Sequence, residues 1–128
     1  MREQFVPENI AFDLKNAGYD ERSYGRYFNG KLSFNLAKIF EPNSETNASD
    51  MANAPLWDQV IDWLDSKGKI ISVKPTTRSG SIRYIYSISV ALVKLNDGAI
   101  ITQMSVDSYA TRAEAREQAI IKALTLIK

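Results

Sequence analysis

Hydrophobic residues recur with helical spacing in three separate parts of the chain. Pro7 suits the first position of a helix because its φ is already fixed, and Gly18 ends that helix. A second helix begins at Pro55 and ends at Gly68, and a third begins at Thr111. The third helix carries a wide apolar stripe, whose small alanines allow close approach to a sheet. Its members are Ala119, Ile120, Ala123, Leu124 and Ile127.

Between the first two helices, a turn signal separates two short runs of alternating apolar and polar residues. The pair Asn29-Gly30 is typical of a two-residue hairpin turn. Residues 27–28 before it and residues 31–36 after it are therefore predicted as two short strands. The segment 41–54 that follows is polar and has no periodicity, so it is predicted to be a loop.

Three further strands are predicted between the second and third helices. Residues 69–74 form a short apolar strand that ends at Pro75, with a loop after it. Residues 82–95 alternate over a long stretch, a tight turn follows at residues 96–98, and residues 99–106 form the last strand. The short links between these strands indicate an antiparallel meander.

These elements predict an α+β fold in a single domain, residues 1–128. Residues 1–40 form an N-terminal helix and short hairpin, and residues 41–54 form the polar loop. Residues 55–128 form an α-β-β-β-α unit with a three-stranded antiparallel sheet. The hairpin and first helix are expected to pack on this unit.

Composition excludes many kinds of chemistry. The chain of 128 residues has no Cys and no His, so it lacks thiolate nucleophiles, the commonest general base and the commonest transition-metal ligand. Asp58, Asp62 and Asp65 lie along one helix face, which we interpret as solvated because no metal-loop spacing accompanies it. We expect no cofactor, no metal and no enzymatic activity. The start of the chain lacks a signal peptide and no stretch is apolar enough to span a membrane, which predicts a cytoplasmic protein without membrane contact.

Charge is segregated along the chain although the net charge is only +1. Residues 41–66 contain six acidic and no basic residues, and residues 67–94 contain six basic and no acidic residues. Such blocks either neutralise each other in the fold or mark a surface for a partner.

Aromatic residues near arginines form two candidate binding surfaces. Tyr24 and Tyr27 lie in the stretch RSYGRYF, and Tyr84 and Tyr86 share one face of the long predicted strand. Exposed rings of this kind stack on nucleic-acid bases. The alternative interpretation is that the first pair forms the core of the hairpin and that a helix covers the second pair.

The order α-β-β-β-α and the closing sequence TRAEAREQAIIKAL resemble the double-stranded-RNA-binding domain. The resemblance spans about residues 55–127. It implies that fold, with phosphate contacts from Arg112 and Arg116 at the start of the last helix. The second helix, which would face the RNA, presents aspartates that repel phosphates, so the resemblance implies the fold more than the RNA function.

Three longer stretches resemble a set of small uncharacterised proteins from phages and mobile elements of gut Bacteroidales. They are VPENIAFDLKNAGYDERSYGRYFNGKL, APLWDQVIDWLDSKGKIISV and SYATRAEAREQAIIKALTLI. This resemblance spans nearly the whole chain and implies a phage or mobile-element setting, without a mechanism.

The sequence therefore leads to two hypotheses. The first is a non-catalytic binding or adaptor module that contacts a protein partner. The alternative is a nucleic-acid-binding protein, for duplex RNA or single strands, that uses a basic loop and the start of the last helix. Its candidate residues are Lys74, Arg78, Arg83, Arg112 and Arg116.

Overall fold

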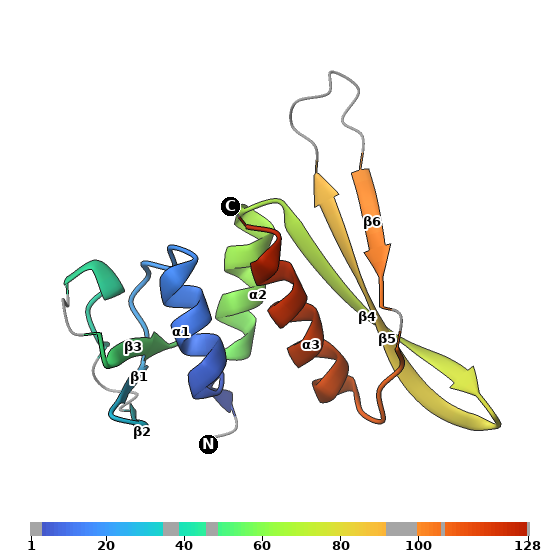
Figure 1. The fold of residues 1–128 in the computed structure, drawn as a ribbon, viewed down its shortest axis with the longest axis horizontal. Helices are drawn as coiled ribbons and strands as arrows, with labels where there is room; N and C mark the ends of the chain where they lie inside the picture. Colours follow the sequence, from blue (N-terminus) through green and yellow to red (C-terminus); the bar gives the residue numbers. More distant parts are fainter. Residues whose placement is uncertain (1–3, 35–38, 46–48, 92–99, 106, 128) are drawn as a thin grey trace. The chain divides into compact units, whose positions relative to one another are not determined.

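The computed structural model describes residues 4–34, 39–45, 49–91, 100–105 and 107–127. Within these ranges the chain forms three α-helices and two antiparallel sheets of three strands each, which confirms the predicted α+β class (Figure 1). In chain order the elements are α1 (Glu8–Asn16), β1 (Gly25–Phe28), β2 (Lys31–Phe34), the 3-10 helix η2 (Asn43–Glu45), β3 (Met51–Ala54), α2 (Trp57–Ser66), β4 (Lys69–Arg78), β5 (Ser81–Ala91), β6 (Ile100–Met104) and α3 (Arg112–Thr125).

The chain divides into two compact units, residues 1–60 and residues 61–128, and the boundary falls inside α2. The first unit contains the sheet of order β2-β1-β3, and the second contains the sheet of order β4-β5-β6. Among the described residues, no helix has both the length and the apolar character needed to cross a bilayer.

Helix α1 ends as its sequence predicts. Gly18 adopts a φ of +95°, which favours glycine. Its N–H donates to the Lys15 carbonyl at 3.2 Å, and the next N–H, from Tyr19, donates to the Leu14 carbonyl at 2.8 Å. This pair of bonds is the Schellman motif, which satisfies carbonyls that the helix end leaves without intrahelical partners. Both Leu14 and Tyr19 are buried, so the helix end is also packed.

The hairpin β1–β2 forms around the predicted turn. Asn29 and Gly30 both have positive φ, 51° and 78°, as a two-residue hairpin turn of type I′ requires. Phe28 pairs with Lys31 across the turn. Gly25, at the other end of β1, permits a close approach, since a Cβ there would lie 2.8 Å from the Phe5 ring.

The predicted polar loop at residues 41–54 is wrong in part, because it contains η2 and the strand β3. β3 pairs with β1 in antiparallel register, with Arg26 opposite Asn53. Asn53 is fully buried although asparagine disfavours strands. Its side-chain amide donates to the Glu41 carbonyl at 2.7 Å, and its amide oxygen accepts from Arg26 Nε at 2.8 Å. These bonds join residues that are far apart in the chain, so the local sequence does not reveal them. They hold β3 in place although its segment has no hydrophobic pattern.

The predicted end of β4 at Pro75 is also wrong, because β4 continues to Arg78 and pairs with β5 along its whole length. The predicted loop after Pro75 is instead the end of a hairpin. Ser79 and Gly80 form its turn with φ of 52° and 79°. Proline is tolerated here because β4 is an edge strand, where its missing N–H points away from the sheet.

Helix α3 lies across β4 and β5, as its apolar stripe predicts (Figure 1). Thr111 caps it, with its hydroxyl accepting from the Glu114 N–H at 3.1 Å. Ala119, Ile120, Ala123 and Leu124 are buried. The predicted order α-β-β-β-α is therefore confirmed from α2 onward, while the predicted turn at residues 96–98 lies outside the described residues.

Candidate functional site

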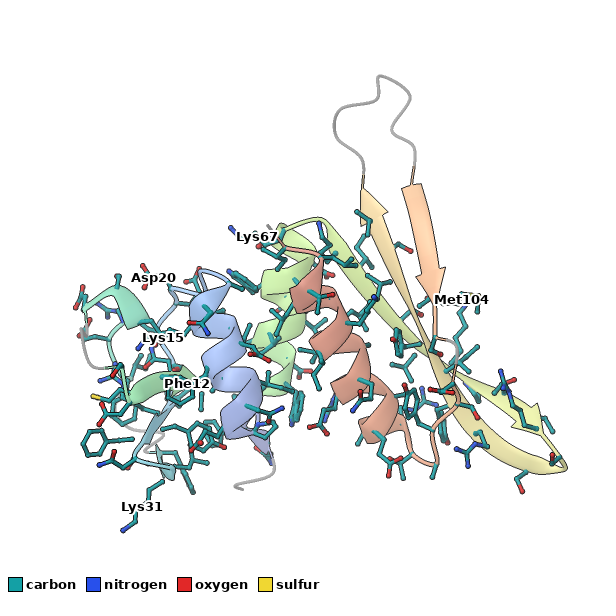
Figure 2. All side chains as sticks on the ribbon, viewed as in Figure 1. Phe12, Lys15, Asp20, Lys31, Lys67 and Met104 are labelled. Carbon is teal, nitrogen blue, oxygen red and sulfur yellow. The ribbon has the colours of Figure 1, made fainter. Side chains whose placement is uncertain are left out.

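The sheet of the 61–128 unit has one face toward α3 and one face away from it. Side chains alternate between the faces, and directly paired residues share a face. Ile71 is paired with Ile88 and Val73 with Tyr86 on the α3 side, where Ile88 is fully buried. On the other face Met104 is 57% exposed and points away from α3 (Figure 2).

The five predicted basic residues do not share one of these faces. Three of them lie on the sheet face away from α3, because their positions in β4 and β5 alternate with those of Ile71, Val73 and Tyr86. These three are Lys74, Arg78 and Arg83. Arg112 and Arg116 lie one turn apart at the start of α3, on the opposite side. Arg83 is held within the fold, because its Nε and Nη2 donate to the hydroxyl and carbonyl of Ser108, both at 2.8 Å.

The four predicted tyrosines also divide between the units. Tyr27 is buried and its hydroxyl donates to the Val6 carbonyl at 2.9 Å, so it is not a surface ring, while Tyr24 is half-buried. Tyr84 and Tyr86 lie half-buried on the α3 side of their sheet. The pair therefore lies on the helix-covered face, as the second interpretation expected.

The rings of Tyr84 and Tyr86 both contact other side chains within the fold. The guanidinium carbon of Arg112 lies 5.0 Å from the Tyr84 ring centroid, within cation–π range. Tyr86 stacks on Tyr109 at a centroid distance of 6.3 Å. Burial raises the pKa of the Tyr86 hydroxyl, and Tyr109 and Asp107 raise it further.

A hollow of about 460 Å³ opens beside β4 and the start of α3. Its size falls in the range of ligand-binding pockets. Apolar side chains line most of it and two arginines complete it; the lining residues are Ile61, Ile71, Val73, Arg112, Ala113 and Arg116. The sequence indicated the two arginines but not the apolar residues, because three elements far apart in the chain contribute them.

The outer edge of β4 runs along this hollow. The backbone groups of Tyr84 bond to Tyr109 and those of Tyr86 to Ser105, all on the side of β5 away from β4. Tyr84 is paired with Pro75 and Tyr86 with Val73. Because the two residues of such a pair direct their backbone groups away from each other, the backbone groups of Pro75 and Val73 point outward from the sheet. The same holds for Ile71, since the pattern repeats every two residues. Among the described residues no strand pairs with this edge. Pro75 could have indicated such an edge from the sequence, because proline within a sheet is confined to edge strands, although the local pattern predicts that the strand ends there.

One side chain reaches the outer edge of β4. Arg112 Nη1 lies 3.4 Å from the Val73 carbonyl oxygen, a long hydrogen bond from an exposed residue. No ion pair joins Arg112 to a carboxylate in the part of the chain that the structure describes. A permanent positive charge therefore stands beside an apolar hollow and an edge strand.

The 1–60 unit has a second hollow, of about 330 Å³, whose polar lining is used within the fold. Lys15 Nζ donates to the Met51 carbonyl at 2.7 Å, and Asn43 donates to the Tyr19 carbonyl at 3.0 Å. Asp20 accepts from a backbone N–H at 2.7 Å. Figure 2 labels Lys15 and Asp20 on this unit. These bonds give the hollow a structural role.

The basic and aromatic stretch of the same unit is likewise used internally. Arg26 donates to Asn53 and to the Glu41 carbonyl, and its guanidinium carbon lies 5.0 Å from the Phe40 ring centroid. Burial lowers the pKa of Arg26, and the Glu41 carboxylate opposes that shift. Arg26, which lies in the aromatic stretch RSYGRYF, thus stabilises β3.

No known protein family, curated protein or solved structure matches the chain. The resemblances drawn from the sequence therefore stay predictions. The hollow of the 61–128 unit and the strand edge beside it are the features from which a function can be inferred.

Proposed function

We propose that the protein is a non-catalytic binding module that docks a protein partner in the hollow of the 61–128 unit. The observation that supports this most directly is the combination of an apolar lining with two cationic side chains at one opening. Apolar contact supplies most of the free energy of such docking, while a few polar groups orient the partner.

The residues around the hollow favour binding over catalysis. Of the described residues that line it, none carries a carboxylate, hydroxyl or amine. Arginine stays protonated at physiological pH and cannot serve as a general base. The side chains therefore supply shape, apolar area and positive charge, which are the requirements of recognition. The sequence resemblance suggests that the partner is a protein encoded by a phage, a mobile element or its host.

The nucleic-acid alternative has less support from the geometry. Its five basic residues divide between the two faces of the sheet, and Arg83 is engaged by Ser108. A phosphate-binding surface would gather its cations along one path.

A selection of peptides displayed on phage against the full chain tests the proposal. We expect enriched peptides that bind the wild-type chain and lose at least about tenfold in affinity for Ala113→Trp, because the indole fills the hollow. Ala113 is exposed, so this change should preserve the fold. Ala110→Trp, an exposed alanine that does not line the hollow, is the matched control and should bind normally.

The proposal fails if the selection yields no binders, or if the binders are indifferent to Ala113→Trp. Titration of duplex RNA and of single-stranded RNA at about 50 mM and 200 mM salt tests the alternative in parallel. Tight RNA binding with a steep salt dependence, lost when Lys74 and Arg78 are changed to Gln, would favour the nucleic-acid hypothesis.

A further inference from the structure

We infer that the partner presents an extended acidic segment, which adds as a strand to the outer edge of β4 and places a carboxylate against Arg112. This inference rests on the proposed function and names the chemistry of the partner. It joins three features of the 61–128 unit. Among the described residues, no strand pairs with the outer edge of β4 and no carboxylate pairs with Arg112, and an apolar hollow runs along that edge.

The strand edge supplies the first feature. The outward-directed N–H and C=O groups of Ile71 and Val73 can each bond to an added strand, as in other cases of strand addition. Pro75, the next outward residue, has no N–H to donate, so favourable pairing ends there. The docking stretch is consequently residues 69–74, which matches a partner segment of about six residues.

The hollow determines which side chains the added strand should carry. Ile71 and Val73 both line it, so the residues opposite them on an added strand would point into it as well. Alternate residues of the partner segment should therefore be apolar. The intervening residues would lie on the sheet face away from α3, where polar side chains are tolerated.

Arg112 determines the charge of the segment. Its long bond to the Val73 carbonyl occupies an acceptor that an incoming backbone N–H would use. Displacement from that carbonyl would leave the guanidinium over the Tyr84 ring and beside the bound segment. A carboxylate at a hollow-facing position can then accept a charge-assisted hydrogen bond from it, which is among the stronger polar contacts. Lys69, at the start of the same stretch, shares the sheet face of Ile71 and Val73 and adds a second positive charge there, which also favours an acidic partner.

The unit 1–60 shows what a satisfied strand edge looks like in this protein. Lys15 bonds to the Met51 carbonyl at 2.7 Å, and the Asn43 side chain accepts from the Asn53 N–H at 2.9 Å. Both short bonds lie on the side of β3 that β1 does not occupy. At the edge of β4, by comparison, the Val73 carbonyl accepts a longer bond, of 3.4 Å, from the exposed Arg112.

The test uses the full chain and a synthetic eight-residue peptide, acetylated and amidated, with valines and one glutamate at alternate positions and threonines between them. A second peptide replaces the glutamate with glutamine. Affinities come from fluorescence anisotropy of labelled peptides, and the binding mode comes from amide hydrogen exchange at Ile71 and Val73. We expect the glutamate peptide to bind about tenfold tighter, the effect of one charge-assisted hydrogen bond, and to protect both amides.

Two variants examine the two contacts separately. Arg112→Gln should abolish the preference for the glutamate peptide. The wild type and this variant, each measured with both peptides, form a double-mutant cycle. Val73→Pro removes one outward N–H without touching the bonds between β4 and β5, and should weaken both peptides about tenfold. Val73→Ala keeps that N–H and controls for the lost side-chain contact. Exchange at β5 amides verifies that each variant is folded.

The outcomes separate this inference from the proposed function. Selected peptides that Ala113→Trp blocks, but that leave the Ile71 and Val73 amides unprotected, overturn strand addition and keep the binding module. Equal affinity for the glutamate and glutamine peptides overturns the acidic partner. A free chain that is dimeric in sedimentation, and monomeric as Val73→Pro, would assign the edge to a second copy and overturn the inference.

Discussion

The two sheets of this protein have the same number of strands but differ in what bonds to the backbone of their edge strands. Each contains a hairpin with a two-residue turn of positive φ, Asn29-Gly30 in one and Ser79-Gly80 in the other. In the 1–60 unit, the half-buried Lys15 and the buried Asn43 bond to the backbone of the edge strand β3. In the 61–128 unit, the edge strand β4 borders an apolar hollow and meets one exposed arginine.

Under the proposed function, this difference separates the edge that supports the fold from the edge that meets a partner. Buried polar groups that are fully bonded make a segment rigid and specify one arrangement. An edge left with outward backbone groups is a liability unless it is protected or used. Pro75 protects one part of β4, and the part beside the hollow is the one that we propose a partner uses.

The largest effect should come from the core of the 61–128 unit. Ile88→Ala removes a fully buried side chain and should lower the free energy of unfolding by about 3–4 kcal/mol. Ile82→Ala makes the same change on the same strand at a side chain that is 69% exposed, and should cost under about 0.5 kcal/mol. Denaturant unfolding measures both. Equal losses from the two variants would contradict the burial pattern of β5.

A smaller effect should come from the polar support of the 1–60 unit. Asn53→Ala leaves Arg26 Nε and the Glu41 carbonyl without their buried partner, at a cost of about 2–3 kcal/mol. Asn9→Ala, at an exposed asparagine of α1, is the matched control and should be neutral or slightly stabilising. Amide exchange should rise in β1 and β3 alone. A rise of the same size in β5 would show that the two units unfold together.

Alkaline pH should weaken the 1–60 unit through Tyr19. Burial raises the pKa of Tyr19 to about 12, with Glu21 adding to the shift, against about 10 for a free tyrosine. Between these values the unfolded chain loses the phenolic proton while the folded chain keeps it. The stability from this group is therefore complete below about pH 10 and is lost as the pH rises toward 12.

Tyr19→Phe isolates that contribution. Between pH 10 and 12 the wild-type chain should lose about 2 kcal/mol more stability than the variant. Tyr24→Phe, at a half-buried tyrosine of the same unit, should follow the wild type. Parallel pH profiles for the wild type and Tyr19→Phe would exclude Tyr19 as the cause.

The smallest effect compares the two edges directly. Lys15→Met removes the 2.7 Å bond to β3 and should cost about 1 kcal/mol, whereas Arg112→Met removes a long exposed bond to β4 and should cost under about 0.5 kcal/mol. Thermal unfolding of the two variants provides the comparison. A larger loss for Arg112→Met would mean that Arg112 supports the fold rather than a partner.

Local signals predicted much of the architecture. The first turn of α3, the end of α1 at Gly18 and the hairpin at Asn29-Gly30 depend on residues within a few positions of one another, and all three formed as predicted. The same reasoning missed β3, since Asn53 has no strand propensity and is held by side chains from elsewhere. It also ended β4 too early, because proline interrupts a central strand but not an edge strand.

The candidate site was only partly predictable. Arg112 and Arg116 stood out as a basic start to the last helix, yet the sequence grouped them with Lys74, Arg78 and Arg83. Strand register decides that these groups lie on opposite faces of the sheet. The apolar lining of the hollow carried no signal of its own, because isoleucine and valine in a strand are expected in any core.

The sequence by itself determined the helices, the turns and the alternation of strand faces, because these depend on short-range backbone preferences and on hydrophobic periodicity. Tertiary structure alone decided which edges are closed and where the hollow opens. Lys15 meets Met51 across 36 residues, and Arg112 meets Val73 across 39. Contacts at such separations depend on how whole elements pack, so no local pattern of residues encodes them.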